Sequence, residues 1–114
     1  MFLGVNKFAN KHSGKKCFVI GAGPSLKDVD TSVISNYPVI CVNSSILKFD
    51  WTIPDDSEKR FWLSCDSLCM EWDYFWKKVI HSDCVRIVRD SWSRKKDKFQ
   101  DAGRCAKDYI TQQK

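Results

Sequence analysis

Long apolar runs and targeting signals are both missing from this sequence. No apolar run approaches the roughly 18–20 residues that a membrane-spanning helix requires. Asn6 and Lys7 interrupt the first residues too early for the apolar core of a signal peptide, and the Met-Gly start needed for myristoylation is lacking. We therefore expect a cytoplasmic protein without a membrane span.

The cysteine pairs of a zinc knuckle are also missing. Six cysteines occur at positions 17, 41, 65, 69, 84 and 105, and none forms a Cys-x-x-Cys pair. Cys17, Cys41, Cys65 and Cys84 lie in apolar, strand-like runs, and a buried free cysteine packs as a small hydrophobe. We predict reduced core thiols and no metal site.

Internal repeats and low-complexity tracts are absent, and the composition is that of one folded domain. The 114 residues are 43% hydrophobic and 13% aromatic, which is too apolar for a disordered chain and too short for two domains. We expect a lead-in segment over residues 1–13 and a single domain over residues 14–114. The ends are basic, whereas residues 17–85 carry six basic and ten acidic side chains.

Four apolar runs predict buried strands, and the segments between and after them have apolar residues at helical spacing. The strand-like runs are residues 15–21, 38–42, 60–65 and 84–88. The helical patterns are residues 26–34, a stripe of Leu68, Trp72, Phe75, Trp76 and Val79, and a last helix from about Ser93 to Ile110. Alternation of this kind predicts a Rossmann-like three-layer α/β fold with a short, about four-stranded, mostly parallel sheet. Such a small sheet has an open edge. We therefore expect either that the chain is the N-terminal half of a larger domain, or that a second copy or a partner chain completes the sheet.

Small or polar residues follow all four predicted strands. They are Gly21–Ser25, Asn43–Ser45, Asp66–Ser67 and Arg89–Ser91. Ligands of open parallel sheets bind beyond the carboxyl ends of the strands. The pattern therefore predicts a binding site at that edge.

The first of these strand ends is a glycine turn, Gly21-Ala22-Gly23-Pro24-Ser25. Glycines let the backbone approach a ligand closely, and the start of a following helix suits a phosphate. Leu26 replaces the third glycine of a dinucleotide fingerprint, and no Gly-Lys-Ser/Thr of a P-loop follows. A purely structural turn remains the alternative.

The stretch from Asn10 to Leu26, with its Gly-x-Gly-Pro-Ser-Leu block, resembles the opening of a bacterial glycosyltransferase-like family. That family includes motility-accessory, flagellin-modifying proteins and the 6-hydroxymethylpterin pyrophosphokinase-like domain. A similar block opens the bacterial sialyltransferases that use CMP-activated sialic acid, and Asn43 is similar to an Asn that ends their second strand. The resemblance covers Phe8 to Asp66, about half of the chain.

The resemblance implies a sheet that binds a nucleotide or a nucleotide-sugar donor, CMP-linked or linked to another nucleoside phosphate. The positions that it implies as nucleotide-binding are Gly21, Ala22, Gly23, Pro24, Ser25, Asn43, Ser44 and Asp66. Asp66 would hold a ribose hydroxyl or a divalent ion, or would only cap the following helix. The implied function lies in surface glycan synthesis or protein glycosylation, with a glycan or protein acceptor.

The sequence departs from the sialyltransferases in its length and in the absence of an evident general base. His12 precedes the first strand and His81 ends a helix, so both are expected at the opposite edge of the sheet. Two alternatives therefore stay open: Mg²⁺-dependent pyrophosphoryl transfer to a pterin, and a non-catalytic nucleotide-binding remnant that needs a partner chain. Acids interrupt the basic run Arg94–Lys98, which argues against nucleic-acid binding.

Overall fold

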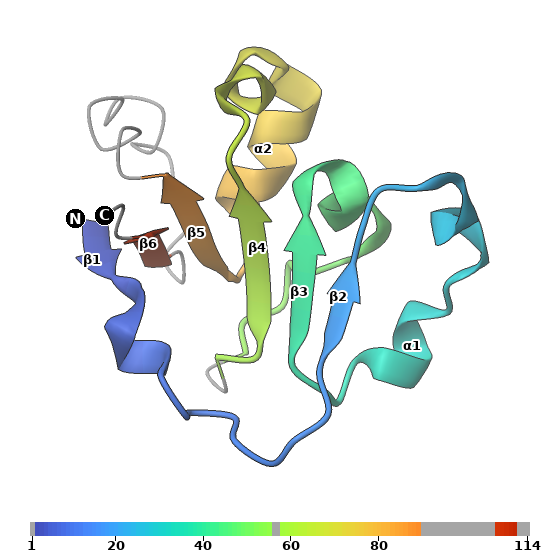
Figure 1. Cartoon of the computed structure of the whole chain (residues 1–114). Helices are drawn as coiled ribbons and strands as arrows, with labels where there is room; N and C mark the ends of the chain where they lie inside the picture. Colours follow the sequence, from blue (N-terminus) through green and yellow to red (C-terminus); the bar gives the residue numbers. More distant parts are fainter. Residues whose placement is uncertain (1, 56–57, 90–106, 112–114) are drawn as a thin grey trace.

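A computed structural model describes residues 2–55, 58–89 and 107–111, which form one parallel sheet (Figure 1). Its strands are β1 (Phe2–Gly4), β2 (Phe18–Ile20), β3 (Val39–Val42), β4 (Arg60–Ser64), β5 (Val85–Arg89) and β6 (Lys107–Thr111). Across the sheet the order is β1-β6-β5-β4-β3-β2, and every neighbouring pair is parallel. The predicted parallel α/β class is confirmed, and β2 to β5 are the four expected strands.

Strands β1 and β6 extend the sheet to six and are not predicted by the sequence. Phe2 of β1 lies opposite Asp108 of β6, so the predicted lead-in segment contributes a strand of its own. The helix predicted up to Ile110 is wrong for residues 107–110, which belong to β6, and the rest of that prediction lies outside the described residues. Strand β6 is paired with β5 on one side and β1 on the other, and this ladder overrides the helical spacing.

The two α-helices pack on one face of the sheet (Figure 1). The α-helices are α1 (Thr31–Ile34) and α2 (Asp73–His81). The 3-10 helices are η1 (Val5–Phe8), η2 (Pro24–Asp28), η3 (Asn43–Lys48) and η4 (Ser67–Glu71). Ile34 of α1, Phe75 of α2 and Trp62 of β4 belong to one buried cluster, which is the main core. Leu68 and Trp72 of the predicted stripe are exposed, because η4 is a 3-10 helix whose period differs from that of α2.

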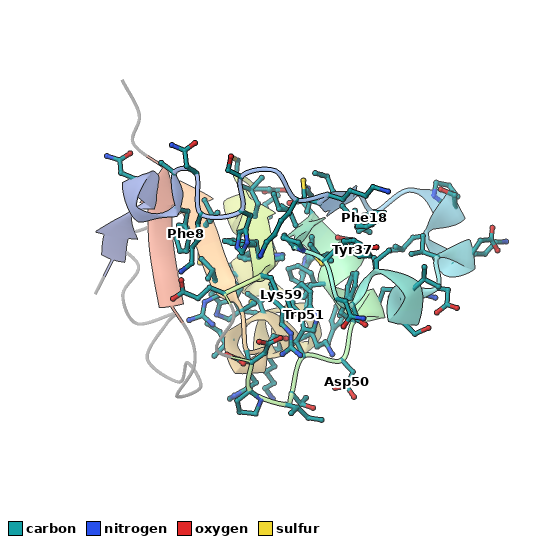
Figure 2. The ribbon with its side chains drawn as sticks, turned by 90° about the horizontal axis from the view of Figure 1, so that it is seen from below. Phe8, Phe18, Tyr37, Asp50, Trp51 and Lys59 are labelled. Carbon is teal, nitrogen blue, oxygen red and sulfur yellow. The ribbon has the colours of Figure 1, made fainter. Side chains whose placement is uncertain are left out.

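The opposite face of the sheet carries a smaller cluster around Phe61 and Val85. The ring of Phe8 meets that of Phe61 edge-on at 5.4 Å. Figure 2 views the edge at which the strands begin and shows Phe8 and α2 on opposite sides of the sheet. Within residues 2–55, 58–89 and 107–111, this face is covered by η1 and the segment after it rather than by an α-helix, so the expected third layer is not seen there.

The described cysteines are all free thiols, but not all of them are core residues. Cys41, Cys69 and Cys84 are buried, whereas Cys17 and Cys65 are exposed. Cys17 lies just before β2 and Cys65 just after β4, so both lie beyond the strands, where the sheet is not covered by packed side chains. The predicted burial of these two thiols is therefore wrong. Cys105 lies outside the described residues. No helix in the described part of the chain is long and apolar enough to cross a membrane.

Candidate functional site at the carboxyl ends of the strands

Strands β2, β3 and β4 are neighbours, so the residues that follow them meet at one edge of the sheet. In the register, Ile20 lies opposite Cys41, and Val42 lies opposite Leu63. The next residues along each strand bring the glycine turn, Asn43 and Ser64 side by side at the upper edge in Figure 1. Arg89 ends β5 at the same edge, and residues 90–91 of that predicted strand end lie outside the described residues.

The glycine turn from Gly21 to Ser25 is exposed along its whole length. A Cβ atom added at Gly21 or Gly23 would meet nothing within 4 Å, and neither residue has a positive φ. Neither crowding nor backbone strain in the protein therefore demands glycine there, and the space above the turn is open. Pro24 begins η2, where Leu26 N donates to Gly23 O at 3.0 Å. The 3-10 pattern leaves Ser25 N–H, one residue earlier, without a partner inside the turn.

Asn43 is held in a left-handed backbone conformation, with φ of 55°, directly after β3. Asparagine tolerates this region better than most side chains. The indole Nε1–H of Trp62 donates to Asn43 O at 2.9 Å, and Ser64 Oγ donates to Asn43 Oδ1 at 2.7 Å. Both oxygens of Asn43 are thus engaged. Its Nδ2 amide, which has no partner in the described part of the chain, is an oriented donor at an exposed position.

The two serines after Asn43 differ in their roles. Ser45 is fully buried, and its Oγ lies 2.8 Å from Ile20 O and 2.9 Å from Val42 O. This hydroxyl ties the end of β2 to the end of β3 and is therefore structural. Ser44 is partly exposed and remains a candidate for ligand contact.

Asp66 lies beyond the end of β4 and caps η4. Its Oδ1 accepts from Leu68 N at 3.0 Å, and its own N–H donates to Ser64 Oγ at 3.2 Å. The capping role that the sequence offers as one alternative is therefore present. The side chain is exposed, and within residues 2–55, 58–89 and 107–111 Oδ2 has no hydrogen-bond partner. Ser64 joins Asp66 to Asn43 by contacting both.

Neither histidine belongs to this edge. His12 Nε2 donates to Glu58 O at 3.0 Å, and its ring lies edge-on to Phe61 near the edge where the strands begin. His81 is exposed in the last turn of α2, which precedes the start of β5. The described residues also contain no group of three His, Cys, Asp or Glu side chains that is able to hold a metal ion.

Comparisons with protein-family models, with curated proteins and with solved structures find no match for this chain. The family resemblance of the Gly-x-Gly-Pro-Ser-Leu block therefore stays a prediction, and the case for a site depends on the geometry described above.

Proposed function

We propose that the carboxyl edge of β2, β3 and β4 binds a nucleotide or nucleotide sugar. In this proposal the chain is the donor-binding domain of a cytoplasmic glycosyltransferase-like protein in surface glycan synthesis or protein glycosylation. The observation that carries it is Asn43. One hydrogen bond fixes its backbone carbonyl and one fixes its side-chain oxygen, and the Nδ2 donor is left free next to a glycine turn with open space above it.

Each part of the edge fits one part of such a ligand. The open backbone at Gly23 and the N–H and hydroxyl of Ser25 suit a phosphate group. The Nδ2 donor of Asn43 suits an acceptor on the base or the sugar, and Asp66 Oδ2 suits a hydroxyl donor. When a sugar is transferred to a glycan or protein hydroxyl, the departing phosphate gains negative charge, which the amides of the turn would stabilise. We assign no general base.

The carboxylate of Asp66 favours a second candidate function, pyrophosphoryl transfer to a pterin. Magnesium is often held by one or two carboxylates together with substrate phosphates, and Asp66 Oδ2 is available for that role. The two candidate functions differ in their dependence on metal. Pyrophosphoryl transfer requires ATP to bind together with Mg²⁺, whereas in the glycosyltransferase-like function a pyrimidine nucleotide sugar would bind without a metal. Nucleotide binding without any turnover would indicate a non-catalytic domain that acts with a partner chain.

Calorimetric titration of the full chain with CMP, CDP, UDP, GDP and ATP, each with and without Mg²⁺, tests the proposal. The site variant is Asn43→Gly, because glycine accepts the left-handed backbone and only the amide is lost. The matched control is Asn36→Gly, which removes the same amide from an exposed turn at the other edge of the sheet. Thermal unfolding of each variant confirms that it is folded.

We expect one nucleotide class to bind, and Asn43→Gly to weaken it about tenfold, as loss of one oriented hydrogen bond does. Asn36→Gly should bind like the unmodified chain. Equal weakening in both variants, or no binding of any nucleotide by the folded chain, would contradict the proposal. The preferred nucleotide and its Mg²⁺ dependence then choose between the two candidate functions.

A further inference from the structure

A hollow lies at the opposite edge of the sheet, where the strands begin. It has a volume of about 210 Å³ and lies on the helix-covered face, between α1, the start of β3 and β4, and the segment after η3. Its lining residues are Thr31, Ser32, Ser35, Val39, Phe49, Asp50, Trp51 and Arg60. Figure 2 looks onto this edge and shows Trp51 within the body of the protein and Asp50 toward the outside. The volume suits a molecule with few non-hydrogen atoms rather than a nucleotide.

The hydroxyl protons of Ser32 and Ser35, two of the three hydroxyl residues that line this pocket, are already used by the protein. Ser32 Oγ donates to Asp30 Oδ1 at 2.6 Å, and Ser35 Oγ donates to Ser32 O at 3.0 Å. A hydroxyl has a single proton, so both side chains can offer a ligand only acceptor lone pairs. Asp50 accepts from Thr52 Oγ1 at 2.9 Å through Oδ1, and within the described residues Oδ2 has no partner. The polar side of the pocket is therefore rich in acceptors.

The cation in the pocket lining, Arg60, is balanced by nearby carboxylates. The guanidinium of Arg60 faces two carboxylates, with Nε 3.9 Å from Asp55 Oδ2 and Nη1 3.8 Å from Asp83 Oδ2. Nη1 also donates to Ile53 O at 2.7 Å, so this cation is largely committed to the protein. Asp50 adds a carboxylate with no ion pair in the described chain. The hydrogen bonds from Ser32, together with the charge of the nearby Lys48, lower the pKa of Asp30.

Three other lining residues form an apolar part of the pocket wall. Val39, Phe49 and Trp51 are all buried, and the Phe49 and Trp51 rings pack with their centroids 4.9 Å apart. Arg60 lies over the Trp51 ring at 6.0 Å, so the indole offers a ligand its edge rather than a free face. An alkyl stem lies well against such a wall, while its charged end reaches the carboxylate at the rim.

We propose that this pocket binds a primary ammonium group on a short alkyl stem, with the ammonium on Asp50 and the serine oxygens and the stem against Val39, Phe49 and Trp51. An ammonium supplies three donors and no acceptor, which complements the carboxylate of Asp50 and the acceptor lone pairs of Ser32 and Ser35. The same chemistry occurs in a free small amine and in a lysine side chain of another protein. The site is independent of the nucleotide edge.

Titration of the ¹⁵N-labelled full chain followed by NMR tests this inference, with the Trp51 indole N–H signal as the local reporter. The probes are n-butylammonium for a free amine, Nα-acetyl-lysinamide for a protein lysine, and 1-butanol as the uncharged match. Asp50→Asn removes the exposed carboxylate, and Ser35→Leu fills the pocket from an exposed position, so both variants should fold. Glu71→Gln is the matched control, because it makes the same charge change at an exposed residue near the other edge.

We expect saturable shifts at Trp51 with an ammonium probe, none with 1-butanol, and a dissociation constant raised about tenfold in Asp50→Asn, as loss of a charge-assisted bond predicts. Ser35→Leu should abolish the shifts, and Glu71→Gln should leave them unchanged. Tighter binding of the lysinamide would assign the site to a lysine of a partner, and tighter binding of butylammonium to a small amine. Absence of saturation with both cations, or equal shifts with 1-butanol, would overturn the inference.

Discussion

Ser64 Oγ donates a 2.7 Å hydrogen bond to Asn43 Oδ1 and so joins the carboxyl ends of β4 and β3. Ser64 is 2% exposed, whereas Asn43 is exposed, so a buried hydroxyl orients a surface amide. The consequence is that Asn43 can present only its Nδ2 donor outward. Orientation by a buried partner is what distinguishes a prepared binding group from an ordinary surface asparagine.

Ser64→Ala should weaken nucleotide binding severalfold and lower the free energy of unfolding by about 1 kcal/mol, because the amide loses the bond that orients it. Calorimetry and urea unfolding measure the two effects. Ser82→Ala is the control: Ser82 is also buried, and its Oγ donates to Lys78 O at 2.6 Å, far from this edge. It should lose similar stability with unchanged affinity. Equal affinity in both variants would show that Ser64 does not prepare Asn43.

Trp62→Phe should lower the free energy of unfolding by about 2 kcal/mol, because the variant leaves a small cavity and removes the donor to Asn43 O. The indole is fully buried in the main core, and its Nε1 makes the 2.9 Å bond to Asn43 O. Trp72→Phe, at a half-exposed indole, should stay within about 0.5 kcal/mol of the unmodified chain. Urea unfolding decides, and similar losses in the two variants would contradict the assigned core.

Arg86→Ala should lower the free energy of unfolding by about 3 kcal/mol or more, because it opens a cavity and removes the donors to two carbonyl groups. Arg86 is fully buried, and its Nη1 donates to Val79 O at 3.3 Å and Ile80 O at 3.2 Å, near the end of α2. Arg86→Met restores volume without donors, so its loss should be smaller. Urea unfolding of both variants is the measurement. A loss below about 1 kcal/mol in Arg86→Ala would contradict a role in anchoring α2.

Stability should fall as the pH rises from about 8.5, the ordinary pKa of a thiol, toward 11. Burial raises the pKa of Cys69 to about 11 and raises that of Cys41 further. In this window the unfolded chain releases thiol protons that the folded chain retains, so unfolding becomes more favourable. Urea midpoints across this range give the slope, and Cys69→Ala should flatten it. An unchanged slope in that variant would contradict the assigned cause.

The sequence predicts strands β2 to β5 because each is a compact apolar run with a turn at its end. It misses β1 because Phe2–Gly4 runs directly into η1 with no polar turn at its end, and β6 because Tyr109 and Ile110 also fit the spacing of a helix. Both strands owe their place to partners far away in the chain, which local patterns do not contain.

The candidate nucleotide edge could be anticipated because parallel strands bring their carboxyl ends together. The two hydrogen bonds that fix Asn43 could not be anticipated, because Trp62 and Ser64 lie on the neighbouring strand β4 and are distant from Asn43 in the sequence. The ammonium pocket also escapes the sequence. Its lining comes from four separate segments, around α1, Val39, Phe49 and Arg60, and no single motif marks it.

Alkylation of Cys65 in the presence of nucleotide tests the central claim most directly. Cys65 is exposed between Ser64 and Asp66 at the proposed site, and Cys17 is exposed before β2 at the other edge, so one chain holds both probe and control. Peptide-resolved mass spectrometry with a maleimide reports each rate separately. We predict that the nucleotide selected by calorimetry slows labelling of Cys65 at least severalfold and leaves Cys17 unchanged. Equal rates at Cys65 with and without saturating nucleotide would contradict a binding site at the carboxyl edge.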